Sequence, residues 1–214
     1  LYLFVESQED EAIAGVRQTL YINLMVWLFI IITTILLTNM TVAFYQRELK
    51  QLASLDGLTQ LLNRQAFEII SEKLLADSRR HQQSLSVMIA DVDLFKRIND
   101  SYGHQTGDLV LKQVAQILRD SVRESDVVCR WGGEEFALFL PKCALEDAER
   151  IAEKIRERVE ALALNDDTYS VPVTISIGVA EYQASENLKD VFARADKALY
   201  RAKVGGRNKV VLSY

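Results

Sequence analysis

The sequence predicts an α/β or α+β fold around one sheet, preceded by a single transmembrane helix. Residues 18–46 carry no formal charge, although 26% of the chain is charged. Beyond them, apolar segments of strand and helix type alternate, which is typical of one sheet covered by helices. The chain has 214 residues and is 49% hydrophobic, which is enough for one substantial core.

The uncharged segment, residues 18–46, is long enough to be a transmembrane helix. About 20 helical residues cross the hydrocarbon layer, and this segment has 29. A buried core helix is the alternative, but such helices rarely run this long without a charge. A signal peptide is disfavoured because the segment is preceded, where a basic region belongs, by Glu6, Glu9, Asp10 and Glu11.

The charges beside the span predict its orientation. Residues 1–46 hold one basic and four acidic residues, whereas Arg47 and Lys50 follow the span. Because positive charge favours the cytoplasmic side, we expect residues 47–214 to be cytoplasmic. Since the chain begins with Leu1 instead of Met, we expect residues 1–17 to be the end of a truncated extracytoplasmic region.

Two shorter patterns flank the span. Residues 1–5 alternate aromatic and aliphatic side chains as a strand does, and a helical pattern from Glu9 runs toward the span. On the other side, Leu49, Leu52 and Leu55 recur every three residues. This spacing predicts a helical stalk over residues 47–55 that continues the span and leads into one domain, residues 56–214.

The elements of this domain follow from periodicity and from helix and turn signals. Asn63 is expected to cap a helix over residues 64–80. A hairpin turn at Gly132 and Gly133 joins two expected strands, and Gly205 with Gly206 ends the last helix. The expected strands are 85–90, 127–130, 135–140, 171–182 and 208–212, and the other expected helices are 94–101, 106–122, 145–162 and 188–203.

Charge disfavours a nucleic-acid partner, and cysteine usage disfavours a disulfide-bonded or metal-binding pair. Residues 47–214 hold 24 basic and 26 acidic residues, so no basic excess favours a nucleic-acid partner. Cys129 and Cys143 lie among apolar neighbours in the cytoplasmic part. We expect reduced thiols in the core, with a disulfide or a metal pair as the alternative.

Acidic residues mark two candidate sites. Asp91 and Asp93 follow the strand 85–90, so one is a candidate metal ligand and the other a candidate cap of the next helix. In Gly132-Gly133-Glu134-Glu135, the glycines leave bare backbone against which a nucleotide can lie, and the acids offer the oxygen ligands that Mg²⁺ prefers. Taken alone, this segment is equally consistent with an ordinary hairpin.

Together with their flanks, these motifs resemble the GGDEF family, the bacterial diguanylate cyclases. The signature is similar to Arg130-Trp131-Gly132-Gly133-Glu134-Glu135-Phe136, with Glu134 where the family name has Asp; either carboxylate can bind Mg²⁺. Further similar segments are DGLT (56–59) with NR (63–64), DVDLFKRIND (91–100), GH (103–104) with GD (107–108), ISIGVA (175–180) and KVGGRN (203–208). The resemblance covers residues 54–214 and implies a GGDEF nucleotide-cyclase-like domain, with a central, mainly antiparallel sheet surrounded by helices.

The resemblance also implies an activity. Two GTP molecules would condense into cyclic di-GMP with release of two pyrophosphates, each domain of a homodimer holding one GTP. Asp91, the backbone carbonyl of Val92, and Glu134 would hold Mg²⁺, with Mn²⁺ as a possible substitute, and Glu134 would take the proton of the 3′-hydroxyl. The alternative is a catalytically silent GGDEF domain that binds GTP or cyclic di-GMP and signals by contact.

Further residues are implied to contact the substrate. Lys96, a second catalytic candidate, would neutralise phosphate charge together with Lys203 and Arg207, while Asn99 and Asp108 would read the guanine edge beside His104. Gly132 and Gly133 would present bare backbone, and Glu135 and Asp93 are candidates for supporting the ligands. The plainer alternatives are a solvated Lys96, a helix-capping Asp108 and a structural His104.

Two regulatory features complete the resemblance. Arg123 and Asp126 form an RxxD whose Asp lies six positions before Gly132, the spacing of the family's inhibitory product site for cyclic di-GMP. An arginine at a helix end beside an aspartate that caps the next strand is the alternative. The region before the span resembles the exit of a Cache sensor. Because the family is bacterial, the predicted single span and its charge-based orientation indicate a protein of the bacterial inner membrane with its catalytic domain in the cytoplasm.

Overall fold

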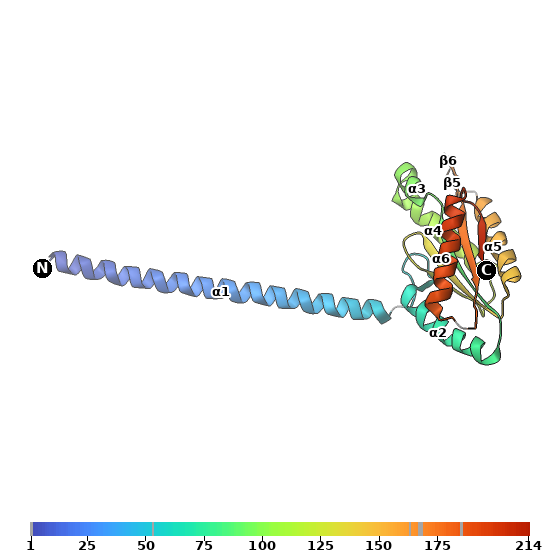
Figure 1. The fold of residues 1–214 in the computed structure, drawn as a ribbon. Coiled ribbons are helices and arrows are strands. Elements are labelled where there is room, and N and C mark those ends of the chain that lie inside the picture. The colour runs from blue at the N-terminus through green and yellow to red at the C-terminus, as the bar shows by residue number, and fades with distance from the viewer. Residues whose placement is uncertain (1, 53, 163, 167–168, 185) are drawn as a thin grey trace. The chain divides into compact units, whose positions relative to one another are not determined.

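The structure is a computed structural model that describes residues 2–52, 54–162, 164–166, 169–184 and 186–214. It divides into two compact units, Leu1–Leu52 and Ala53–Tyr214 (Figure 1). The first unit is one helix, α1 (Tyr2–Leu52). The strand expected at residues 1–5 is therefore wrong for residues 2–5, and the resemblance to a Cache exit loses that support.

Within α1, the segment Thr19–Val42 is long and apolar enough to cross a membrane by length and composition. Its 24 residues include a window of mean hydropathy 2.4, and none of that window is buried, so a core helix is disfavoured. Threonine hydroxyls in it donate to carbonyls of the preceding turn, as Thr34 does to Ile30 at 2.7 Å and Thr38 to Thr34 at 2.8 Å. These polar groups are satisfied inside the helix, as an apolar surrounding requires.

The expected helical stalk over residues 47–55 is only partly present. Helix α1 ends at Leu52, whereas Leu55 forms an isolated β-bridge with Leu62. Leu55 thus belongs to the second unit, which we call the α+β unit (Ala53–Tyr214), and the leucine stripe does not extend to it as one helix.

The α+β unit is built on one six-stranded sheet, which confirms the expected central, mainly antiparallel sheet. The three inner pairings are antiparallel and the two edge pairings are parallel. In spatial order the strands are β1 (Leu62–Asn63), β3 (Val127–Arg130), β4 (Glu135–Pro141), β2 (Leu85–Val92), β7 (Ile175–Glu181) and β8 (Val210–Ser213).

Helices cover both faces of this sheet (Figure 1). Alternate residues of β2 point to opposite faces, so Met88 packs with α4 (His104–Ser121) and α5 (Leu145–Glu160). Val87 packs on the other face with α2 (Arg64–His81) and α6 (Leu188–Val204). The short helix α3 (Phe95–Tyr102) packs against α4. Asn63 caps α2 as expected, its side chain accepting from the Ala66 N–H at 2.9 Å.

Helix α6 lies directly on β7 because position 178 has no side chain. A Cβ on Gly178 would lie 2.1 Å from the Ala195 carbonyl oxygen and 2.3 Å from the Leu199 nitrogen, closer than any real contact. The backbone of α6 therefore rests on the sheet, and this fixes the height of its last turn, which carries Lys203.

Several segments differ from the expectation. Strand β2 extends to Val92 and so includes Asp91, which was expected to follow it, β8 begins at Val210 instead of residue 208, and α4 begins at His104 instead of residue 106. The strand expected over residues 171–182 is divided: β6 (Tyr169–Val171) pairs with β5 (Leu164–Asp166) in a small separate hairpin, and β7 begins only at Ile175. Pro172 lies in the gap, where it has no N–H to donate to a ladder. After α6, left-handed backbone occurs at Gly206 (φ 109°), while Gly205 has φ −73°.

Candidate active site

The pairing of β2 with β4 brings the two acidic motifs together. Asp91 lies directly opposite Glu135, and the Val92 N–H donates to the Glu134 carbonyl at 3.2 Å. The end of β2 and the turn between β3 and β4 are thus one site, although 43 positions separate Asp91 from Glu134 in the sequence.

This site concentrates negative charge around Asp91. Its side chain is only 10% exposed and forms an ion pair with the Lys203 ammonium at 2.8 Å. Burial raises the pKa of Asp91; the ion pair with Lys203 opposes this, and the charges of Glu134 and Glu135 raise the pKa further. A partly desolvated carboxylate beside two others is stabilised by additional positive charge, so these donors suit a hard divalent cation.

The residues that the structure describes do not by themselves form a complete metal site. Among the described residues, no three His, Cys, Asp or Glu side chains converge on one point. Mg²⁺ usually takes one or two carboxylates and completes its shell with water and substrate phosphates. The arrangement of Asp91 and Glu134 therefore fits a cation that arrives with a phosphorylated ligand.

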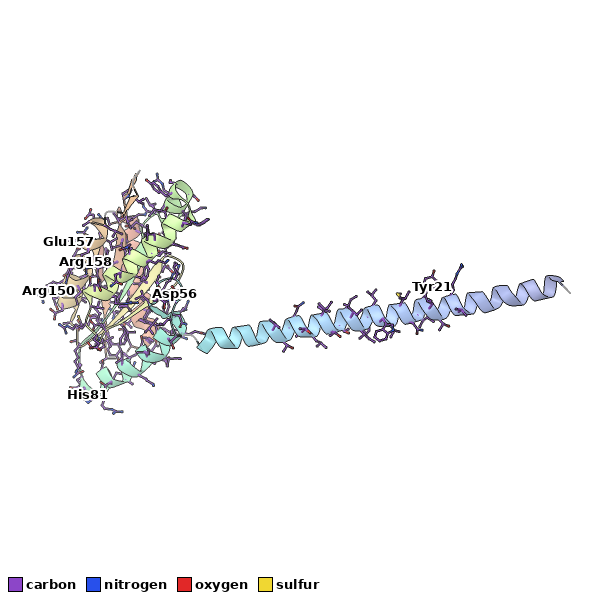
Figure 2. All side chains as sticks on the ribbon, turned by 180° about the vertical axis from the view of Figure 1, so that it is seen from behind. Tyr21, Asp56, His81, Arg150, Glu157 and Arg158 are labelled. Atoms are coloured by element: carbon purple, nitrogen blue, oxygen red, sulfur yellow. The ribbon has the colours of Figure 1, made fainter. Side chains whose placement is uncertain are left out.

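The glycine turn is held by Arg130, whose role was not anticipated. Its guanidinium donates to the Gly133 carbonyl at 2.7 and 3.1 Å and forms an ion pair with Asp56 at 3.1 Å. Asp56, labelled in Figure 2, also accepts from the backbone N–H and hydroxyl of Thr59 at 2.8 and 2.7 Å. In the sequence, this ion pair was indicated only by the resemblance of the two segments that contain Asp56 and Arg130 to motifs of the family.

The two glycines of the turn differ. A Cβ on Gly132 would lie 2.8 Å from the Glu135 Oε2 atom, so this position excludes a side chain unless Glu135 moves. Gly133 has open space around it and is exposed. Gly133 therefore has exposed backbone with free space around it, while Gly132 makes room for Glu135; contact of either glycine with a ligand stays a prediction.

Asp93 is not a helix cap, contrary to one of the two expectations for this pair. The residue before α3 is Leu94, which has φ 54° and no capping side-chain bond. The buried Asp93 carboxylate instead accepts from Thr174 and Ser176 hydroxyls at 2.9 and 2.7 Å and from the Asn208 N–H at 3.0 Å. Asp93 thus links the end of β2 to β7 and to the segment after α6, while its expected support of the metal ligands stays a prediction.

The expected guanine-reading residues lie on α3 and α4. A Cβ on Gly107 would lie 1.9 Å from the Asn99 Oδ1 atom, so the two helices meet closely at Asn99. Asp108 follows Gly107 and is exposed, and since α4 begins at His104, Asp108 does not cap it. His104 and Lys96 are also exposed.

The expected inhibitory pair lies on a different part of the α+β unit. Asp126 accepts from the Arg123 N–H at 2.8 Å and returns a backbone bond at 3.0 Å, so the carboxylate closes the turn before β3. The Arg123 side chain is exposed. Both residues line an open groove of about 500 Å³, together with Gln60, Arg119 and Glu124.

Comparison with known proteins finds the same combination of motifs elsewhere. The family profile described as "Diguanylate cyclase, GGDEF domain" matches residues 53–209. Diguanylate cyclase A of Treponema denticola is 40% identical over 176 residues, which are 80% of this chain and 47% of that protein. The chain thus spans about half the length of this relative.

Solved structures share the fold. The GGDEF domain of DgcB from Caulobacter crescentus, in complex with c-di-GMP, is 36% identical with a TM-score of 0.72, over 75% of this chain and 95% of that one. The active GGEEF domain of a diguanylate cyclase from Vibrio cholerae is 32% identical with a TM-score of 0.69, over 72% and 99% of the respective chains.

Proposed function

Because the chain belongs to the GGDEF family of diguanylate cyclases, we propose that it condenses two GTP molecules into cyclic di-GMP and two pyrophosphates. The observation that carries the proposal is the convergence of Asp91, Lys203 and the glycine turn at the ends of the central strands β2 and β4. In each half-reaction a 3′-oxygen bonds to the α-phosphorus of the other GTP while the bond from that phosphorus to the leaving pyrophosphate breaks.

The acidic residues supply the metal ligands and the base. Asp91, the Val92 carbonyl and Glu134 would hold Mg²⁺ or Mn²⁺, and such a cation, when bound, neutralises triphosphate charge and lowers the pKa of a nearby hydroxyl. Glu134 accepts the proton of the 3′-hydroxyl. Its position on the turn, whose Gly133 carbonyl is fixed by Arg130, keeps this carboxylate beside Asp91.

The remaining residues bind the nucleotide. Lys203, Lys96 and Arg207 neutralise phosphate charge, and the backbone of Gly132 and Gly133 leaves room for the ligand. Asn99 and Asp108 accept and donate at the guanine edge, with His104 beside them; a carboxylate that accepts from guanine N–H groups disfavours adenine, which lacks that donor pattern. GTP is therefore preferred to ATP.

The reaction, the apolar helix and the RxxD pair each bear on how the whole chain works. One domain holds one GTP, so two chains must meet as a homodimer. The α1 segment Thr19–Val42 anchors each chain in the bacterial inner membrane as a single pass, with the cyclase in the cytoplasm. Cyclic di-GMP binds Arg123 and Asp126 as an inhibitor, because a guanidinium can pair with phosphate or with guanine acceptors.

The test is product formation by the full chain in detergent micelles with Mg²⁺ and GTP. We expect cyclic di-GMP, detected by chromatography, and a fall of at least about 100-fold in Glu134→Ala, the usual effect of losing a general base. Glu149→Ala, an exposed carboxylate on α5, is the matched control. Near wild-type turnover in Glu134→Ala would overturn its role, and GTP binding without any product would favour the silent signalling domain.

A further inference from the structure

The turn after α6 has a backbone conformation that has to be held in place. Three successive residues are left-handed, Gly206 at φ 109°, Arg207 at φ 64° and Asn208 at φ 45°. Residues with a side chain adopt this region rarely and at a cost in free energy, and such strain persists where the surroundings enforce it. We call this segment the 206–208 turn.

The backbone of the turn is held from the sheet. The Asn208 N–H donates to the Asp93 Oδ2 atom at 3.0 Å. That carboxylate is itself fixed, because Asp93 is 5% exposed and accepts from the Ser176 hydroxyl at 2.7 Å and the Thr174 hydroxyl at 2.9 Å. Asp93 therefore joins β2, β7 and the 206–208 turn at one buried point.

The side chain of the turn is held from α5. The Asn208 amide donates to the Glu160 Oε1 atom at 2.7 Å, and its oxygen accepts from the Arg156 guanidinium at 3.2 Å. Arg156 in turn donates to the other Glu160 oxygen at 2.8 Å, which closes a ring of three side chains. The pKa of Glu160 lies below its usual value because Arg156, and then Asn208, donate to its carboxylate.

We propose that Asp93 and Glu160 are positioning residues: they fix the 206–208 turn and thereby hold Arg207 and Lys203 at the triphosphate site. Lys203 pairs with Asp91, and Asn208 of the turn bonds to Asp93 two residues further on, so both contacts are made to the same short segment of backbone. This inference rests on the proposed function, in which Lys203 and Arg207 bind phosphate. Cations placed before the ligand arrives lose less conformational freedom on binding than mobile ones.

The test separates the turn from general stability. Glu160→Ala removes the acceptor for Asn208, while Glu160→Gln keeps an acceptor oxygen. Glu153→Ala is the matched control, because Glu153 also pairs with Arg156, at 2.7 Å, but is not bonded to Asn208. The variants are made in the full chain in detergent micelles. Hydrogen exchange of peptides covering residues 203–209 is measured by mass spectrometry, together with the affinity for α,β-methylene GTP and the KM and kcat for GTP.

In Glu160→Ala we expect exchange in the turn to quicken by about two- to tenfold, the range set by one net hydrogen bond. The Kd of the analogue and the KM should rise by a similar factor, with kcat changed less. Glu160→Gln and Glu153→Ala should resemble the wild type. Asp93→Asn should also quicken exchange at Asn208, whereas Ser86→Ala in β2, which loses a buried hydrogen bond to the Cys143 carbonyl, should not.

Unchanged exchange in Glu160→Ala would overturn the claim that Glu160 fixes the 206–208 turn. Faster exchange with unchanged analogue affinity would overturn the positioning role, and an equal effect of Glu153→Ala would assign the changes to α5 as a whole. Should the wild-type chain make no product, the proposed function fails, whereas exchange and analogue binding still decide the present inference. Glu160 is on the surface, so its variants test whether the 206–208 turn is held in place even if Asp93→Asn does not fold.

Discussion

Replacing Asp56 by Ala is expected to lower the free energy of unfolding of the α+β unit by about 3 kcal/mol. The carboxylate accepts from three donors, the Thr59 N–H, the Thr59 hydroxyl and the Arg130 guanidinium, which is shared between both oxygens; we take each donor as a net value of about 1 kcal/mol. The side chains of Asp56 and Arg130 are 24% and 17% exposed, so the ion pair is only partly screened by solvent.

The loss should depend on pH. Burial of Asp56 raises its pKa, but hydrogen bonds from Thr59 and Arg130 outweigh this and hold the pKa below its ordinary value of 3.8. A carboxyl whose pKa is lowered by folding stabilises the fold above its unfolded pKa, and this stabilisation disappears as the pH falls through the folded value. The difference between wild type and Asp56→Ala should therefore be full at pH 7 and shrink in acid.

The assay is urea unfolding of residues 54–214 followed by circular dichroism. Asp147→Ala is the control, since Asp147 pairs with Arg150 while the two side chains are 51% and 78% exposed; its loss should stay within about 0.5 kcal/mol. A double-mutant cycle with Arg130→Ala isolates the ion pair. A loss in Asp56→Ala below about 1 kcal/mol at pH 7, or one that persists unchanged in acid, would refute the reasoning from these hydrogen bonds.

Three other outcomes are expected. Because the proposed reaction needs two domains that each hold one GTP, specific activity should rise with protein concentration and with enforced dimerisation, and constant activity in a demonstrably monomeric sample would contradict the proposed homodimer. Arg123→Ala should abolish tight cyclic di-GMP binding in titration calorimetry and prolong synthesis without slowing its initial rate; unchanged affinity would exclude this site. Burial raises the pKa of Cys129 to about 12 and of Cys143 to about 11, so iodoacetamide at pH 8 should modify them only after unfolding. Rapid modification of either cysteine in the folded protein, detected by mass spectrometry, would contradict this.

The elements that local pattern determines were predictable. Asn63 caps α2, the glycine pair joins β3 to β4, and the two cysteines are buried free thiols as expected. The convergence of Asp91 with the glycine turn was expected from motifs, and the sheet register supplies its geometry. Periodicity missed the division of the strand at Pro172, because an apolar run of alternating type reads as continuous.

The supporting contacts were not predictable because they join distant parts of the chain. Arg130 meets Asp56 across 74 positions, and Asp93 meets Asn208 across 115. Asp93 was one of two acids at a strand end, and nothing local distinguishes a carboxylate that caps a helix from one that accepts three donors from other elements. That distinction depends on which strands become neighbours, and this is decided by the packing of the whole sheet.

The missing side chain at position 178 has a genetic consequence. Any mutation there adds at least one methyl group where the backbone of α6 already touches the sheet, and overpacking of this kind is relieved by shifting the helix. Since Lys203 lies in the last turn of that helix, the shift reaches its ion pair with Asp91 although neither of these two residues is changed. An allele at codon 178 would thus disturb the ion pair between Lys203 and Asp91 from beneath the sheet. A smaller side chain at Ala195 or Leu199 would not suppress it, because the atoms that a new Cβ meets are backbone atoms, the Ala195 carbonyl oxygen and the Leu199 nitrogen and Cα.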